Sequence, residues 1–134
     1  MRLVLDTNVL IAAFVARGLC HELLEHCERE HVLVSSSVIL TEFEEKLVHK
    51  LKVPAAAAQN ARALNEAHME LITPEPLPEP ICRDPDDDWV LATAVSGACD
   101  AIITGDKDLL ALAHVGRITI LSPAEFWRYE ANQY

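Results

Sequence analysis

The start of the chain limits the possible folds more than any other segment, because a short apolar run ends there at an aspartate. Leu3, Val4 and Leu5 form this run, which is typical of a strand buried on both faces of a parallel sheet. Asp6 ends it, and apolar residues then recur at helical spacing. We therefore expect Asp6 at the carboxyl end of a central strand, where open α/β sheets bind their ligands. The alternative is that Asp6 only caps the helix that follows.

The rest of the chain repeats this alternation of short apolar runs and amphipathic segments. Further strands are expected over 31–35, 101–104 and 118–121, with a short edge strand near 71–73. Helices are expected over 7–17 (ending at Gly18), 21–30, from Ser36 or Ser37 to Leu51, from Pro54 to His68, from Asp84 through Val95, and after Ser122. Alternating strands and helices predict the α/β class, as a three-layer α/β/α sandwich around a central parallel sheet.

The length of the chain and its pattern of turn-forming residues favour one domain over residues 1–134. The alternating prolines of 74–80 exclude a helix there and predict an extended connector rather than a domain boundary. No apolar run is long enough to span a bilayer, and the N-terminus shows no signal-peptide pattern. We therefore expect a cytoplasmic protein without a membrane partner.

The four cysteines form no C-x-x-C pair, and reduced, mostly buried thiols are expected. A zinc site from Cys20, His21, His26 and Cys27 is an alternative, but their spacing scatters these side chains around a helix.

The formal net charge of −10 argues against an ordinary nucleic-acid binder, because such affinity comes largely from Lys and Arg on phosphates. Either the partner is not a nucleic acid, or bound metal ions neutralise a clustered part of the charge.

The positions of the acids favour the second explanation. Asp6 and Asp106 each follow a predicted strand, Asp87 opens a predicted helix, and Glu42 lies early in a helix that follows a strand. All four are expected to converge on the carboxyl edge of the sheet. The alternatives are ordinary ones: Glu42 can pair with Lys46 at i+4, and the acids of 84–88 match a helix dipole.

Clustered carboxylates need a cation. A pair about 4 Å apart repels by roughly 4 kcal/mol at an effective dielectric near 20. Oxygen ligands of this kind suit Mg²⁺ or Mn²⁺, which can activate water and stabilise charge on a phosphoryl oxygen. The residues thus predict metal-assisted phosphodiester hydrolysis.

Four motifs occur together in order along the chain: Asp6-Thr7-Asn8-Val9-Leu10, Thr41-Glu42, Arg83-Asp84-Pro85-Asp86-Asp87-Asp88 and Thr104-Gly105-Asp106-Lys107-Asp108. Together they closely resemble the PIN-domain ribonucleases, and most closely the toxins of prokaryotic toxin–antitoxin pairs.

The resemblance implies a Rossmann-like sandwich that cuts single-stranded RNA with Mg²⁺ or Mn²⁺, commonly as a homodimer, and an antitoxin as protein partner. It places Asp6, Glu42, Asp87 and Asp106 on the catalytic metal-binding positions, with Asn8 and Thr104 supporting them. Asp88 and Asp108 are additional metal-ligand candidates. Asp84 and Asp86 are interpreted as a solvated helix start.

Two other classes of function compete with this one. A phosphatase or phosphotransfer domain would use Asp6 as nucleophile, although Asn8 stands where such enzymes usually carry a second aspartate. A non-catalytic module would use the same acids to hold a structural ion or a basic partner.

Overall fold

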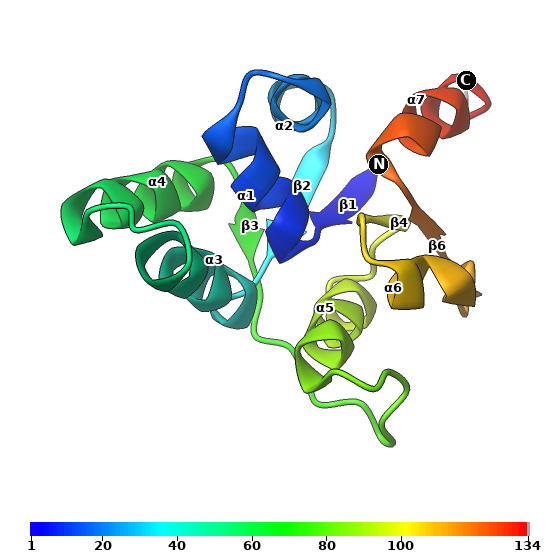
Figure 1. Cartoon of the computed structure of the whole chain (residues 1–134). Coiled ribbons are helices and arrows are strands. Elements are labelled where there is room, and N and C mark those ends of the chain that lie inside the picture. Colours follow the sequence, from blue (N-terminus) through cyan, green and yellow to red (C-terminus); the bar gives the residue numbers. More distant parts are fainter. Residues whose placement is uncertain (134) are drawn as a thin grey trace.

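A computed structural model describes residues 1–133, which form a sheet enclosed by helices (Figure 1). The strands are β1 (Arg2–Leu5), β2 (Val32–Ser35), β3 (Glu70–Leu71), β4 (Ala101–Ile103), β5 (His114–Val115) and β6 (Ile118–Leu121). The helices are α1 (Thr7–Val15), α2 (Leu19–Glu30), α3 (Ser37–His49), α4 (Ala55–Ala67), α5 (Pro85–Ser96), α6 (Lys107–Leu112) and α7 (Pro123–Ala131).

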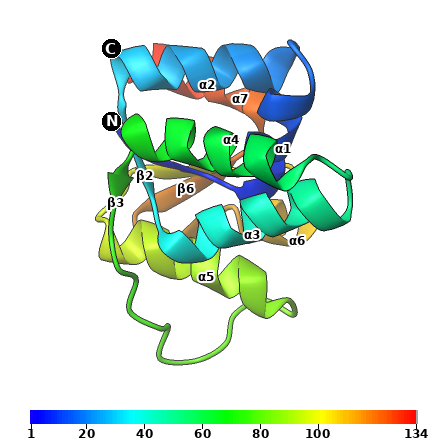
Figure 2. The same cartoon turned by 90° about the vertical axis from the view of Figure 1, so that its left-hand side faces the viewer.

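The sheet has the strand order β3-β2-β1-β4-β6-β5. Every pairing is parallel except that of β5 with β6, which is antiparallel. Helix α5 packs on β1, β2 and β4, while α2 and α7 lie beside each other on the opposite face (Figures 1 and 2). The α/β class and its layered sheet are therefore confirmed. The short antiparallel β5 was not expected, because two residues carry no readable alternation.

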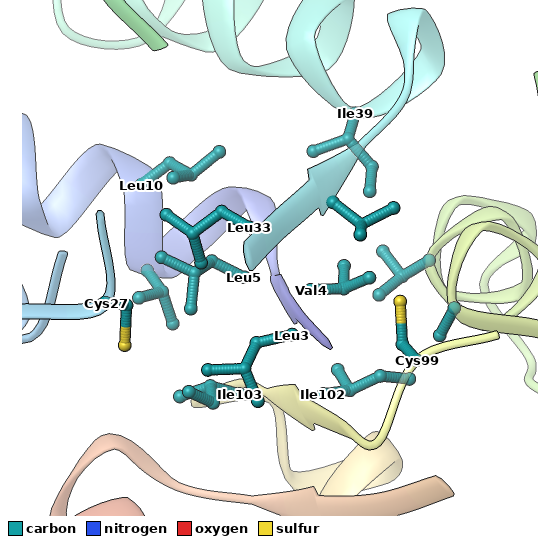
Figure 3. Close-up of a cluster of buried hydrophobic side chains, with 14 of the residues drawn as sticks. Leu3, Val4, Leu5, Leu10, Cys27, Leu33, Ile39, Cys99, Ile102 and Ile103 are labelled. Atoms are coloured by element: carbon teal, nitrogen blue, oxygen red, sulfur yellow. The ribbon is translucent and has the colours of Figure 1, made fainter. Parts of the chain in front are cut away.

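The core lies on both faces of β1 and β4, as their unbroken apolar runs predict. Leu3, Val4, Ile102 and Ile103 have no exposed surface, and Figure 3 shows them packed among side chains from α1, α2 and α3. Because β1 and β4 pair with each other, the residues that follow them emerge side by side at one edge of the sheet.

Side-chain caps begin three of the helices where the sequence places them. Ser36 caps α3, Asp84 caps α5 with Pro85 in the first turn, and Ser122 with Glu125 forms a capping box on α7. The segment between β3 and α5 contains no helix or strand, in agreement with its alternating prolines.

Two predicted helix ends were wrong. Helix α1 ends at Val15, two residues before the predicted end, and Gly18 is the N-cap residue of α2. Helix α3 ends at His49, so Leu51 lies outside it and is 46% exposed.

The buried face of α4 also differs from the expected one. The sequence pattern placed Ala57, Ala61 and Leu64 inward, whereas Ala58, Ala61 and Asn65 are buried and Leu64 is 64% exposed. An alanine-rich helix carries little periodic signal, so its neighbours decide which side faces in.

Within the described residues, no single helix is long and apolar enough to cross a membrane; α1 and α2 pass that test only when taken together, across a bend of 109°.

Candidate active site at the carboxyl edge of the sheet

Asp6 sits at the end of β1 and is only 4% exposed. Its backbone N–H continues the sheet by donating to the Ile103 carbonyl at 3.0 Å. Although Asp6 precedes α1, its side chain makes no capping hydrogen bond. Instead Oδ2 accepts a hydrogen bond from Thr104 Oγ1 at 2.7 Å. The capping alternative is thus wrong, and the carboxylate is turned toward the end of β4.

Thr104 connects Asp6 to Asp106. Its hydroxyl is fully buried, donates to Asp6, and accepts from the Asp106 backbone N–H at 2.9 Å. Asp106 in turn caps α6, with Oδ1 accepting from the N–H groups of Asp108 and Leu109 at 2.8 and 3.2 Å. Oδ2 of Asp106 takes no part in these two bonds.

Asp87 lies in the first turn of α5 and is 8% exposed. Burial raises the pKa of Asp87 to about 7, with further contributions from the negative charges of Asp106 and Asp6. Burial also raises the pKa of Asp6, against the opposing hydrogen bond from Thr104. Three carboxylates from distant parts of the chain are therefore close enough to repel one another.

Glu42, on α3, forms a second acidic group with Asp86, on α5. Its carboxylate pairs with Lys46 Nζ at 2.9 Å, as the i+4 alternative predicts, and Lys46 also donates to Asn8 Oδ1 at 3.5 Å. Burial and the charge of Glu42 raise the pKa of Asp86. Asp86 is exposed at the start of α5, in agreement with its interpretation as part of a solvated helix start, and it also approaches Glu42. Its proximity to Glu42 arises between two helices and leaves no pattern in the sequence.

Lys46 links the two acidic groups, a role that the sequence did not reveal. Burial acts to lower the pKa of Lys46, but Glu42, Asp6 and Asp86 together raise it above its ordinary value. The ammonium group therefore neutralises part of the negative charge from its position between the groups.

Three neighbouring acids have clear structural partners. The Asp88 carboxylate accepts from the backbone N–H groups of Ile81 and Cys82, at 2.8 Å from the latter, and so fixes the loop before α5. Asp108 pairs with Arg83 at 3.0 Å, and Asp84 caps α5. Metal binding by Asp88 or Asp108 stays a prediction.

The oxygen-rich donor set fits a hard divalent cation. The elevated pKa of Asp87 reflects burial and negative charge that such a cation would offset. Among residues 1–133, no three of these acids hold one oxygen each within 4.8 Å of one another. A groove of about 380 Å³ runs beside Glu42 and Asp86.

Comparison with known proteins identifies the family of the chain. A family model described as PIN domain matches residues 2–108. The chain belongs to the PIN-domain family. The match includes all four predicted catalytic acids, two of which directly follow β1 or lie just after β4 and two of which lie on α3 and α5, and the resemblance seen in the motifs is confirmed.

Solved structures share the PIN-domain fold at low sequence identity. VapBC2 from Rickettsia felis, bound to a DNA fragment from their promoter, contains a chain that is 13% identical, with a TM-score of 0.65 over 91% of this chain and 98% of that one. A chain of VapBC-1 from nontypeable Haemophilus influenzae is 17% identical, with a TM-score of 0.65 over 92% of this chain and 99% of that one. Mycobacterium tuberculosis VapC20, a Sarcin-Ricin loop cleaving toxin, is 15% identical, with a TM-score of 0.62 over 84% of this chain and 96% of that one. No curated protein sequence matches the chain significantly.

Proposed function

We propose that this PIN domain is a Mg²⁺- or Mn²⁺-dependent endoribonuclease that hydrolyses single-stranded RNA as the toxin of a toxin–antitoxin pair. The observation that carries the proposal is the convergence of Asp6, Asp87 and Asp106 at one edge of the sheet, where burial first and the charges of Asp106 and Asp6 second raise the pKa of Asp87 to about 7. Family membership supports a nuclease, and the likeness to VapC20 supports a toxin.

In the proposed reaction, Asp6, Glu42, Asp87 and Asp106 hold the cation. Bound there, Mg²⁺ or Mn²⁺ would lower the pKa of water and stabilise negative charge on a phosphoryl oxygen. Thr104 fixes Asp6 through its 2.7 Å hydrogen bond, and the cap on α6 fixes Asp106. The protein thus orients its carboxylates before the cation arrives, which lowers the cost of assembling the site.

Lys46 and Asn8 act beside these ligands. Lys46 holds Glu42 at 2.9 Å; if Glu42 were to bind a cation instead, the ammonium group would be released from this ion pair. A freed lysine at this edge provides a positive charge for an RNA phosphate, which an acidic protein otherwise lacks.

The decisive experiment measures Mn²⁺-dependent cleavage of a panel of single-stranded RNAs. We expect wild type to cleave and Asp6→Asn, Glu42→Gln and Asp87→Asn to be inactive while remaining folded. Asp100→Asn is the matched control, because Asp100 lies away from this edge and accepts from the Arg2 backbone N–H, a bond that Asn preserves. Equal cleavage by wild type and Asp6→Asn would overturn the site.

The same assay separates the competing functions. A phosphatase would hydrolyse p-nitrophenyl phosphate, and its activity would require Asp6 while RNA stayed intact. A non-catalytic module would bind Mn²⁺ and cleave neither substrate.

The antitoxin part of the proposal has its own support. An open groove of about 690 Å³ lies between α1, α2, α3 and α4, with apolar side chains on its walls. Phe14 is 43% exposed there and Leu64 64%, and related folds occur in VapBC structures. We expect an apolar segment of the antitoxin to occupy this groove. Binding of the protein encoded next to this one should weaken on Leu64→Glu; unchanged binding would place the interface elsewhere.

We also propose that the protein is a cytoplasmic homodimer. Light scattering on the purified chain tests the assembly, and a monomeric mass at micromolar concentration would contradict it. Cell fractionation tests the location.

A further inference from the structure

A second cluster of metal-ligating side chains lies near the N-terminus, on the side of the sheet where α2 and α7 lie beside each other; Figures 1 and 2 show these two helices. His26 lies on α2, His31 lies between α2 and β2, and Glu130 lies on α7. Their ligand atoms all lie within 4.8 Å of one another, and among residues 1–133 no other group of three His, Cys, Asp or Glu side chains meets this criterion. The cluster is thus more compact than the acids of the candidate active site.

Both imidazoles approach the same carboxylate oxygen. Nε2 of His26 is 2.6 Å and Nε2 of His31 is 2.5 Å from Oε2 of Glu130. Two imidazoles and one carboxylate are a ligand set typical of zinc, which also accepts a fourth ligand from water. Tetrahedral coordination needs ligand atoms about 3.4 Å apart at zinc bond lengths near 2.1 Å. Opening each contact by less than 1 Å, through side-chain rotation, therefore makes room for an ion.

The surroundings hold the rings and leave one side open. The His31 side chain is 1% exposed, while those of His26 and Glu130 are 23% and 18% exposed. The His26 ring packs on Trp127 with centroids 4.7 Å apart, and the His31 ring lies edge-on to Phe126 at 5.9 Å. Aromatic walls fix ring orientation, and the exposed side provides an entry path.

We propose that His26, His31 and Glu130 form a second metal site, which takes Zn²⁺ or another divalent ion that prefers imidazole ligands. The zinc alternative considered from sequence combined His26 with Cys20, His21 and Cys27; the structure replaces those three partners with His31 and Glu130. An ion at this site joins α7 to α2 and to the start of β2. Its role is therefore structural, since it ties the last helix to the sheet. The proposal does not depend on the nuclease activity.

The test uses full-length protein without a polyhistidine tag, titrated with Zn²⁺ in competition with a chromophoric chelator. We expect one Zn²⁺ per chain at this site, with affinity falling about tenfold or more in His26→Asn and in Glu130→Gln. His49→Asn is the matched control, because His49 is exposed at the end of α3. All measurements are repeated in an Asp87→Asn background, so that zinc at the acidic site is not counted.

A second measurement, made mainly on the wild-type protein, tests the proposal even if some variants fold poorly. Equimolar Zn²⁺ should shift the imidazole NMR signals of His26 and His31 in the wild-type protein and raise its melting temperature, and Glu130→Gln should lose that rise. If Zn²⁺ leaves these signals unchanged, or binds His26→Asn as tightly as wild type, the cluster is held by hydrogen bonds alone and the proposal is overturned. Loss of Zn²⁺ binding without loss of RNA cleavage separates this site from the nuclease.

Discussion

At the scale of single residues, Asp87 carries the clearest electrostatic cost. It is nearly buried, faces Asp6 and Asp106, and has a pKa of about 7. A carboxyl group in the unfolded chain ionises near 3.9. Between these values the folded protein binds a proton that the unfolded chain has lost, so the stability of the metal-free protein falls as pH rises through this window.

Asp87→Asn should remove this pH dependence, because the amide carries no charge at any pH in the window. In EDTA we expect the variant to melt above wild type at pH 8 and close to it at pH 5, as measured by circular dichroism. Asp100→Asn should follow wild type at both values. A lower melting temperature for Asp87→Asn at pH 8 would show that the carboxylate serves folding.

Gly97 shows a steric limit at the end of α5. A Cβ atom there would lie 2.8 Å from Val34 Cγ1 and 3.0 Å from the Thr93 carbonyl oxygen. We expect Gly97→Ala to lower the free energy of unfolding by about 1–3 kcal/mol, through overpacking of β2 against α5. Urea denaturation measures this, and Gly18→Ala is the control, since its Cβ would meet nothing within 4 Å. Equal midpoints for the two variants would contradict the close approach.

At the scale of elements, helix starts follow local chemistry. The capping box on α7 combines Ser122 Oγ accepting from the Glu125 N–H at 3.2 Å with Glu125 accepting from the Ser122 N–H at 2.9 Å. The backbone hydrogen bond from Ser122 is the main cause of the lowered pKa of Glu125. The stabilisation that ionised Glu125 provides is present above the ordinary pKa of a glutamate, and it is lost as pH falls through the lowered pKa.

Ser122→Ala should cost about 1 kcal/mol of unfolding free energy, because an N–H in the first turn of α7 loses its acceptor. Ser122→Thr keeps the hydroxyl and should stay close to wild type in the same urea titration. Equal losses in both variants would mean that packing around Ser122, and not the cap, determines the effect.

At the scale of the whole molecule, the net charge of −10 opposes any polyanion. The acids that repel RNA are also the ligands that we assign to the cation, so RNA affinity should depend on divalent ions more than on basic side chains.

We expect fluorescence anisotropy of a labelled single-stranded RNA, read immediately after mixing, to show binding with Mn²⁺ and a fall to baseline with EDTA. Samples are matched in ionic strength with NaCl, since monovalent salt also weakens phosphate contacts. Binding that persists in EDTA would indicate a basic path for RNA, with the metal needed only for cleavage.

Features that depend on neighbours along the chain could be predicted from the amino-acid order. Apolar runs located β1 and β4, and a serine or an aspartate with proline located helix starts. Because parallel strands end at the same edge, the expected meeting of Asp6 and Asp106 followed from these local patterns.

Features that depend on how helices and strands pack could be seen only in the folded molecule. The approach of Asp86 to Glu42, the position of Lys46 between two acidic groups, and the meeting of His26, His31 and Glu130 each join separate elements. The inward face of α4 was decided in the same way. Side-chain periodicity reports which face of an element is apolar, but not which other element covers it. Charged partners on separate elements were therefore settled only when the helices packed against the sheet, whereas local pairs such as Glu42 with Lys46 followed from spacing along the chain.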